Sequence, residues 1–307
     1  MKRLSTFSIT CSLAALLGGC AVEADIGDME DPGLDIEQTE TSTSDPCATQ
    51  SCKEPTIWIH GCPVAQINAE IASHFTDAQR QVFLANGYPS NYLYRFVYQG
   101  PQCDSNVAVA QAIADYVKQV RATTGAARVN IVAHSIGSNA ARLYLAFGGY
   151  RYVRHFVAIA GANHGSLAAQ QGGPWQDQFG YPAFEGAKEM YPPYACWGEA
   201  WSGEAANIQW WVNGCLTTTG RRFWADETPR EDQVDYLSIW NTIDEAVLPH
   251  ESACLNQSRQ NDCASSVNAA VTVPPGPGPC GPTGCPGHVA MLWDPGVMQR
   301  VLTFMNQ

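Results

Sequence analysis

Ser135 lies in the stretch RVNIVAHSIGSNAARLYLAF, residues 128–147. A run of β-branched apolar residues precedes the serine and helix formers follow from Ala140, so the stretch predicts a buried strand, a tight turn and a helix. Ala133 and Gly137, two residues to either side of the serine, are small enough to let the strand and the helix approach closely. The serine hydroxyl would then stand at the apex of a strained bend, where it can act as a nucleophile. An ordinary Ser-Gly turn is the alternative, so a nucleophile also requires a base, an acid and an oxyanion hole beside it.

A histidine and an aspartate later in the chain occupy positions suited to moving the proton of this serine. Asp244 comes in a strand-like stretch, residues 235–247. His288 is expected in a loop between a predicted last strand, residues 267–273, and the final helix. Asp294 is the expected N-cap of that helix, and the proline that follows it would occupy the first helical position. We expect His288 to take the serine proton and return it to the leaving group. Asp244 would hold the imidazole in the right tautomer and stabilise the imidazolium.

Other side chains could compete for both roles. The competitors are Glu245, Asp232 and Asp235 for the acid, and His60, His164 and His250 for the base. The two aspartates precede their strand and would lie at the wrong end of the sheet, whereas Glu245 is the nearest rival. We expect His60 to pack within its loop. His164 comes before every plausible acid strand and His250 follows the acid too closely, so we expect structural roles for them as well.

The predicted oxyanion hole consists of two backbone N–H groups. An apolar strand, residues 55–61, runs into His60 and Gly61, upstream of the serine. The N–H of Cys62 is the expected first donor and that of Ile136, directly after the serine, the second. Two such donors, aimed at a developing oxyanion, typically contribute a few kcal/mol each.

The elements around these residues alternate between strand and helix. This order is typical of a doubly wound α/β sheet, which is mostly parallel. The predicted elements before the serine are strand 55–61, helix 76–86, strand 91–98 and a helix from Ser105 to Gly125; strand 152–160 follows the serine helix. Residues 167–234 break the pattern and hold six of the nine tryptophans. A segment of this kind can be a cap over the active site that binds an apolar acyl chain, or an insertion with a small aromatic core of its own, and we expect a mixture of the two.

The combined motifs resemble those of class 2 lipases (the EstA/EstB-like lipase family) and, more distantly, small bacterial lipases with an Ala-His-Ser-x-Gly elbow. The matching pieces span residues 55–307: His60-Gly61, VNIVAHSIGS, the FVAIAGANHG turn, and the order Ser135, Asp244, His288. The resemblance implies an α/β-hydrolase fold and a serine carboxylic ester hydrolase that works through an acyl-enzyme without a cofactor. Lipids or small esters would be its substrates. A polyhydroxyalkanoate or polyester depolymerase and a non-catalytic binding protein on the same fold are the alternatives.

The N-terminal residues predict where in the cell the protein is located. Lys2 and Arg3 precede a short apolar stretch that ends in Leu17-Gly18-Gly19-Cys20, which resembles the lipobox of bacterial lipoproteins. We expect residues 1–19 to be a signal peptide and Cys20 to be lipidated, with an ordinary signal peptide as the alternative. Residues 20–46, rich in acids, would form a disordered tether to the catalytic domain, residues 47–307. The expected location is the bacterial cell envelope, as an outer-membrane lipoprotein, or the medium if the protein is secreted.

Charge and cysteine content limit the partners further. The net charge of −12 argues against binding nucleic acid, and we expect a monomer. Ten of the twelve cysteines follow Cys20, an even number that suits disulfides in an oxidising compartment, and their spacing predicts no metal site. Sequence proximity favours the pairs Cys47–Cys52, Cys196–Cys215, Cys254–Cys263 and Cys280–Cys285, which leaves Cys62–Cys103.

Overall fold

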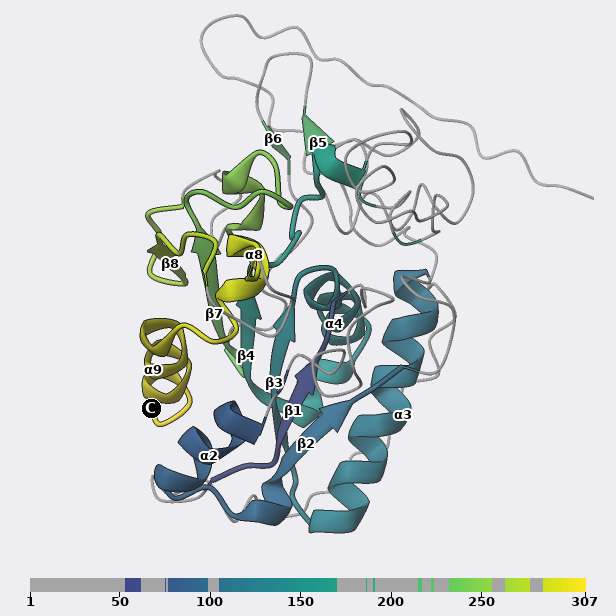
Figure 1. Ribbon diagram of the computed structural model, residues 1–307. Coiled ribbons are helices and arrows are strands. Elements are labelled where there is room, and N and C mark those ends of the chain that lie inside the picture. Colours follow the sequence, from purple (N-terminus) through teal and green to yellow (C-terminus); the bar gives the residue numbers. More distant parts are fainter. Residues whose placement is uncertain are drawn as a thin grey trace, which may run out of the picture. The chain divides into compact units, whose positions relative to one another are not determined.

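Six parallel strands form one sheet, in the order β2-β1-β3-β4-β7-β8, in the computed structural model of the protein (Figure 1). The structure describes residues 53–61, 75, 77–98, 105–169, 186, 190, 215–216, 222–223, 232–255, 263–276 and 284–307. The strands are β1 (Thr56–Ile59), β2 (Leu93–Phe96), β3 (Val129–His134), β4 (Val153–Ile159), β7 (Asp235–Asn241) and β8 (Asn268–Val271). A separate antiparallel pair consists of β5 (Cys215–Leu216) and β6 (Arg222–Phe223). The predicted α/β-hydrolase arrangement, a mostly parallel doubly wound sheet, is confirmed.

The order in which strands are added to the sheet reverses beside β1. The chain passes from β1 outward to the edge strand β2, returns to the other side of β1 as β3, and then continues through β4 and β7 to β8. In open α/β sheets such a point of reversal, at the carboxyl ends of the strands, is where ligands usually bind. Ser135 follows β3 and Gly61 follows β1, so both lie at this point of reversal.

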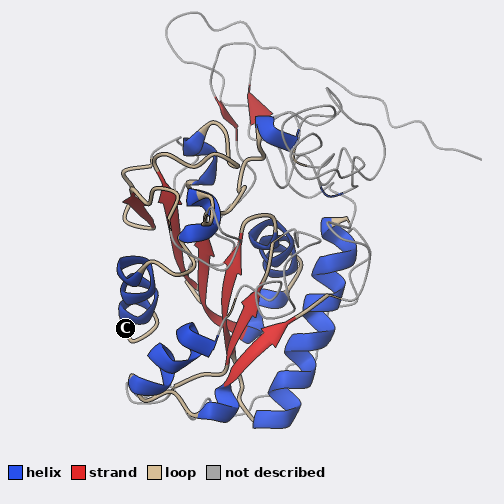
Figure 2. Cartoon of the chain, in the orientation of Figure 1, coloured by secondary structure: helices blue, strands red, loops and turns tan. Residues whose placement is uncertain are grey.

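Helices cover both faces of the sheet (Figures 1 and 2). One apolar core joins the sheet to α3 (Asn106–Thr124) and α4 (Gly137–Ala146). The other core joins the opposite face to α2 (Asp77–Ala85), α8 (Gly287–Ala290) and α9 (Pro295–Phe304). Strand β3 contributes Val129, Ile131 and Ala133 to the first core and Val132 to the second. This burial on both faces explains why its sequence is a nearly continuous apolar run.

The predicted helix ends at α3 and α9 are confirmed. The side chain of Ser105 accepts a hydrogen bond from the N–H of Val107, and Gly125 ends α3 with a φ of 71°, in the left-handed region. Asp294 caps α9 by accepting from the N–H of Val297 at 2.9 Å. Pro295 occupies the first turn of α9, where its missing N–H is tolerated. These caps fix where the helices begin and end next to the sheet.

Several predicted features fall outside the described residues. They include the signal peptide, Cys20 and the tether, most of the insert 167–234, and at least one partner in four of the five expected cysteine pairs. Cys254 and Cys263 form a disulfide, and Cys285 is also disulfide-bonded. No helix among the described residues combines the length and the hydropathy needed to span a bilayer.

Candidate active site

Ser135 occupies a strained turn between β3 and α4. Its φ is 55°, a left-handed conformation that costs a non-glycine residue about 1–3 kcal/mol. The N–H of Ser135 donates to the carbonyl of Ile159 in β4 at 3.0 Å, which ties the turn to the sheet. The serine is 4% exposed, with its side chain at the end of the strand rather than within the core. This geometry matches the bend that the small residues around Ser135 predict.

Two glycines allow the backbone to pass close to the serine. A Cβ on Gly137 would lie 2.3 Å from the carbonyl oxygen of His60, and one on Gly61 would lie 2.6 Å from the Cβ of Ser135. Both distances are too short for real carbon contacts. The loop after β1 therefore packs directly on the turn after β3 only because neither glycine has a side chain.

We expect Gly137→Ala to destabilise the protein. The new methyl group meets the backbone of His60, which cannot rotate away, and overpacking of this kind costs about 1–3 kcal/mol. Urea denaturation would measure the change in the free energy of unfolding. Gly276→Ala is a matched control, because the nearest heavy atom to its new Cβ is 3.7 Å away. Equal stability of the two variants would contradict the close packing at the elbow.

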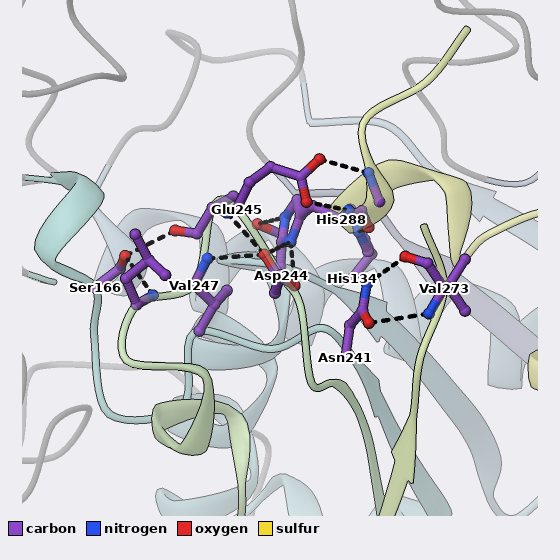
Figure 3. Close-up of polar contacts among 12 residues, drawn as sticks. His134, Ser166, Asn241, Asp244, Glu245, Val247, Val273 and His288 are labelled. Atoms are coloured by element: carbon purple, nitrogen blue, oxygen red, sulfur yellow. Dashed lines mark hydrogen bonds and ion pairs between the residues drawn. The ribbon is translucent and has the colours of Figure 1, made fainter. Parts of the chain in front are cut away.

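Ser135, His288 and Asp244 form one continuous hydrogen-bonded chain. The Nε2 atom of His288 lies 2.9 Å from the Oγ atom of Ser135, and its Nδ1 atom lies 2.9 and 3.0 Å from the two carboxylate oxygens of Asp244 (Figure 3 shows the His288–Asp244 contact). A carboxylate only accepts hydrogen bonds, so Nδ1 carries the proton. Nε2 is thereby left as an acceptor for the serine hydroxyl, which is the tautomer that a general base requires.

The contact between His288 and Asp244 shifts the pKa values of these two residues in opposite directions. Burial alone lowers the pKa of His288, but the Asp244 carboxylate and its hydrogen bond outweigh burial, so the pKa lies above its ordinary value. Burial alone raises the pKa of Asp244, but the His288 ring and two backbone N–H donors hold it below its ordinary value. Asp244 is therefore an anion near neutral pH and favours a proton on His288.

A short loop after β7 presents Asp244 to the histidine. The strand ends at Asn241, whose side chain accepts from the N–H of Ile243 and exchanges two hydrogen bonds with the main chain of Val273. Asp244 Oδ1 accepts from the N–H groups of Ala246 and Val247 at 2.8 and 2.9 Å. The carboxylate is thus held on one side by its own loop and on the other by the imidazole.

Ser166 anchors the other end of this loop. Its hydroxyl donates to the carbonyl of Ala246 at 2.7 Å and accepts from the N–H of Leu248 at 3.1 Å (Figure 3). Ser166 belongs to the turn that follows β4, the strand next to β7 in the sheet. The loop that carries Asp244 is therefore held by the end of a neighbouring strand. Sequence analysis missed the roles of Ser166 and Asn241, because neither side chain belongs to a motif.

His134 is a second histidine in contact with His288. The two ring centroids lie 4.8 Å apart, and the Nε2–H of His134 donates to the main-chain carbonyl of His288 at 3.0 Å. Burial and the neighbouring His288 ring lower the pKa of His134 to about 3, so this ring is neutral near neutral pH. Sequence analysis included His134 in the serine motif but assigned it no contact with the base.

Of the two predicted oxyanion donors, Ile136 is described and Cys62 lies outside the described residues. Ile136 directly precedes α4, and its N–H donates to no residue in the described part of the chain, so it can bind a substrate oxygen. The side chain of Ile136 packs in a small buried cluster with Met190 of the insert. At least one residue of the insert therefore lies next to the serine turn.

The competing residues lie elsewhere or make other contacts. His60 is buried and accepts a hydrogen bond from the N–H of Tyr98 at its Nε2 atom. His164 is fully buried in the turn after β4, and Asp235 lies at the opposite end of β7 from Asp244, beside His155. Glu245 contacts the main chain at His288 instead of its ring. In the described part of the chain, no three His, Cys, Asp or Glu side chains are grouped as a metal site would require.

Comparison with known proteins identifies the same region. A family model described as lipase (class 2) matches residues 53–184, which confirms the predicted resemblance. The match includes β1, the serine turn and β4, and it ends before Asp244 and His288. A search of curated proteins found no match.

Three solved structures illustrate what the chain is similar to. Lipase BlEst2 of Bacillus licheniformis in its mature form is 15% identical, with a TM-score of 0.44 over 63% of this chain and 68% of that chain. The lin2722 product of Listeria innocua is 13% identical, with a TM-score of 0.48 over 83% and 94%. Carboxylesterase CesB of Bacillus subtilis is 16% identical, with a TM-score of 0.44 over 83% and 84%. This chain covers 36% of the propeptide form of BlEst2.

Proposed function

We propose, from the match to class 2 lipases and the geometry around Ser135, that this protein is a serine carboxylic ester hydrolase. The single observation that carries the proposal is the hydrogen-bonded chain from the Ser135 hydroxyl through both nitrogens of His288 to Asp244. Ser135 is the nucleophile, His288 the general base and acid, and Asp244 the residue that orients the imidazole.

The reaction proceeds in two balanced halves. His288 Nε2 takes the hydroxyl proton as Ser135 Oγ attacks the ester carbonyl, and the resulting oxyanion accepts a hydrogen bond from the N–H of Ile136. The tetrahedral intermediate then releases the alcohol, which receives its proton from His288, and leaves an acyl group on the serine. A water molecule, deprotonated by His288, attacks the acyl carbonyl and frees the acid and the serine.

Exposed apolar side chains at the end of the sheet that carries Ser135 support a substrate with an apolar acyl part. Three of the four large hydrophobic residues that are exposed in the described part of the chain follow the carboxyl ends of strands: Val97 after β2, Leu167 after β4 and Ile243 after β7. Ser135 lies at this same end of the sheet. Exposed apolar side chains at this end of the sheet favour esters of fatty acids over small charged esters.

Two assays test the proposal. A fluorophosphonate probe should label the purified protein, and mass mapping should place the label on Ser135. Hydrolysis of p-nitrophenyl esters of increasing chain length, beside a clearing assay on polyester granules, would then distinguish an esterase, a lipase and a depolymerase. Absence of both labelling and hydrolysis would refute the proposal and favour a non-catalytic protein.

We place the enzyme at the bacterial cell envelope, anchored by lipid on Cys20. The basic residues Lys2 and Arg3, the apolar stretch and the sequence Leu17-Gly18-Gly19-Cys20 support this location. We expect Cys20→Ala to move the protein from the membrane fraction to the soluble fraction of cells, as measured by immunoblot. Equal membrane association of the variant and the wild type would contradict the anchor.

A further inference from the structure

A carboxylate outside the chain of Ser135, His288 and Asp244 binds the main chain of the histidine. Glu245 Oε1 accepts from the N–H of Gly287 at 2.5 Å, and its Oε2 accepts from the N–H of His288 at 3.1 Å (Figure 3). These N–H groups belong to the first turn of α8, where they have no partner within the helix. One side chain thus occupies two donors that flank the catalytic base.

The residue beside the base must be glycine for this contact to form. A Cβ on Gly287 would lie 2.7 Å from the carbonyl oxygen of Val273, 3.1 Å from Oε2 of Glu245 and 3.2 Å from Nδ2 of Asn241. The first turn of α8 therefore lies directly against the end of β7 and the loop that follows it. Because Asn241 also binds the main chain of Val273, the same contact region joins the ends of β7 and β8.

The main chain of His288 is held from the opposite side as well. His134, at the end of β3, donates its Nε2–H to the carbonyl of His288, while Glu245 accepts from the N–H of the same residue. The N–H and the carbonyl of the base are thus both bound by side chains. With its ring between Ser135 and Asp244, the base has little freedom to move.

The charge of Glu245 also acts on the imidazole. The groups that face His288 are Asp244 and Glu245 from the loop after β7, and Ser135 and the neutral His134 from the end of β3. After Asp244, Glu245 contributes to the elevated pKa of His288. The two adjacent carboxylates therefore bind different parts of His288: Asp244 contacts the imidazole ring, and Glu245 contacts the main chain.

We propose that Glu245 is a positioning residue, which holds the main chain of His288 so that the imidazole stays between Ser135 and Asp244 throughout the reaction. The proposal rests on the ester hydrolase function proposed above. No bond to Glu245 forms or breaks in the proposed reaction. Its role is to preserve geometry while His288 alternates between neutral and charged forms.

The test compares the isosteric Glu245→Gln variant with the wild type. Glutamine retains one acceptor oxygen but turns an NH₂ donor toward the second backbone N–H, so the clamp is half lost. We expect kcat for p-nitrophenyl butyrate to fall by about tenfold to a hundredfold with KM little changed, because the loss is in the alignment of the base. Loss of the negative charge should also shift the acid limb of the kcat/KM profile to lower pH.

Two further variants separate positioning from general stability. Glu245→Asp keeps the charge but is one methylene shorter, so kcat should fall while the acid limb stays near that of the wild type. Glu251→Gln is the matched control, because Glu251 is an exposed glutamate six residues further along, and it should change neither quantity.

These measurements distinguish a failure of the role proposed for Glu245 from a failure of the proposed ester hydrolase function. If the wild type hydrolyses the ester and Glu245→Gln matches its kcat and its acid limb, the positioning role is wrong. A lower melting temperature alone, without a change in the pH profile, would also overturn it. If Glu245→Gln does not fold, the same profile of Glu245→Asp decides: a kcat equal to that of the wild type would overturn the proposal. If the wild type hydrolyses no ester, the proposed function fails instead.

Discussion

The Ser135→Ala variant should lose ester hydrolysis by a factor on the order of 10⁶ in kcat. Alanine keeps the Cβ that contacts Gly61 and removes only the hydroxyl that lies 2.9 Å from His288. The hydroxyl that would form the acyl-enzyme in the proposed mechanism is then missing. Initial rates on p-nitrophenyl butyrate measure the loss, and circular dichroism should show the same fold as the wild type.

Ser266→Ala is the matched control for this loss. Ser266 is an exposed serine before β8, at the opposite end of the sheet from Ser135, and its variant should keep the wild-type rate. Probe labelling should likewise disappear in Ser135→Ala and persist in the control. A Ser135→Ala protein that folds and still hydrolyses the ester at the wild-type rate would show that the nucleophile lies elsewhere.

The Asp244→Asn variant should lose activity by a factor on the order of 10⁴ in kcat. Asparagine can still accept from the backbone N–H groups that bind Asp244, so the loop should keep its course. Its amide group can, however, donate to Nδ1 of His288, which favours the tautomer with a proton on Nε2. That tautomer cannot accept the proton of Ser135.

The pH profile gives an independent test of the same contact. In the proposed mechanism, hydrolysis requires neutral His288, so activity should be lost as the pH falls through the pKa of this histidine. In the wild type, Asp244 raises that pKa, and the acid limb should lie above the ordinary histidine value of about 6.5. With asparagine the pKa falls, so the residual activity should persist to lower pH.

Asp235→Asn is the control for this variant, because Asp235 is an exposed acid at the far end of the same strand. Its rate and its acid limb should match those of the wild type. An acid limb that does not move in Asp244→Asn would contradict the role of Asp244. A limb that moves in Asp235→Asn instead would favour the rival acid.

Much of the fold could be predicted because its signals are local. The small residues around Ser135 permit a sharp bend, Ser105 and Asp294 cap the helices that follow them, and Gly125 adopts the left-handed conformation that ends α3. Alternation of strands and helices also restricts the sheet to a few topologies, since crossovers between parallel strands are right-handed. Each of these inferences depends on residues only a few positions apart.

The choice between Asp244 and Glu245 could not be settled by such signals. The two carboxylates are adjacent, and which of them meets the imidazole depends on the path of the loop after β7. Asn241 and Ser166 set that path through contacts with residues 32 and about 80 positions away in sequence. The same holds for His134, whose partner His288 lies 154 positions further along the chain.

Local propensity and turn chemistry thus made the serine turn, the order of the elements and the candidates for acid and base predictable from the sequence. The folded structure was needed to show that Asp244 contacts the ring of His288 while Glu245 and His134 bind its backbone. The side chains of two adjacent residues such as Asp244 and Glu245 point in different directions, which depend on the path of the main chain. That path depends on hydrogen bonds between segments that are far apart in the sequence. Packing of the loops after β1, β3 and β7 brings those segments together at one end of the sheet.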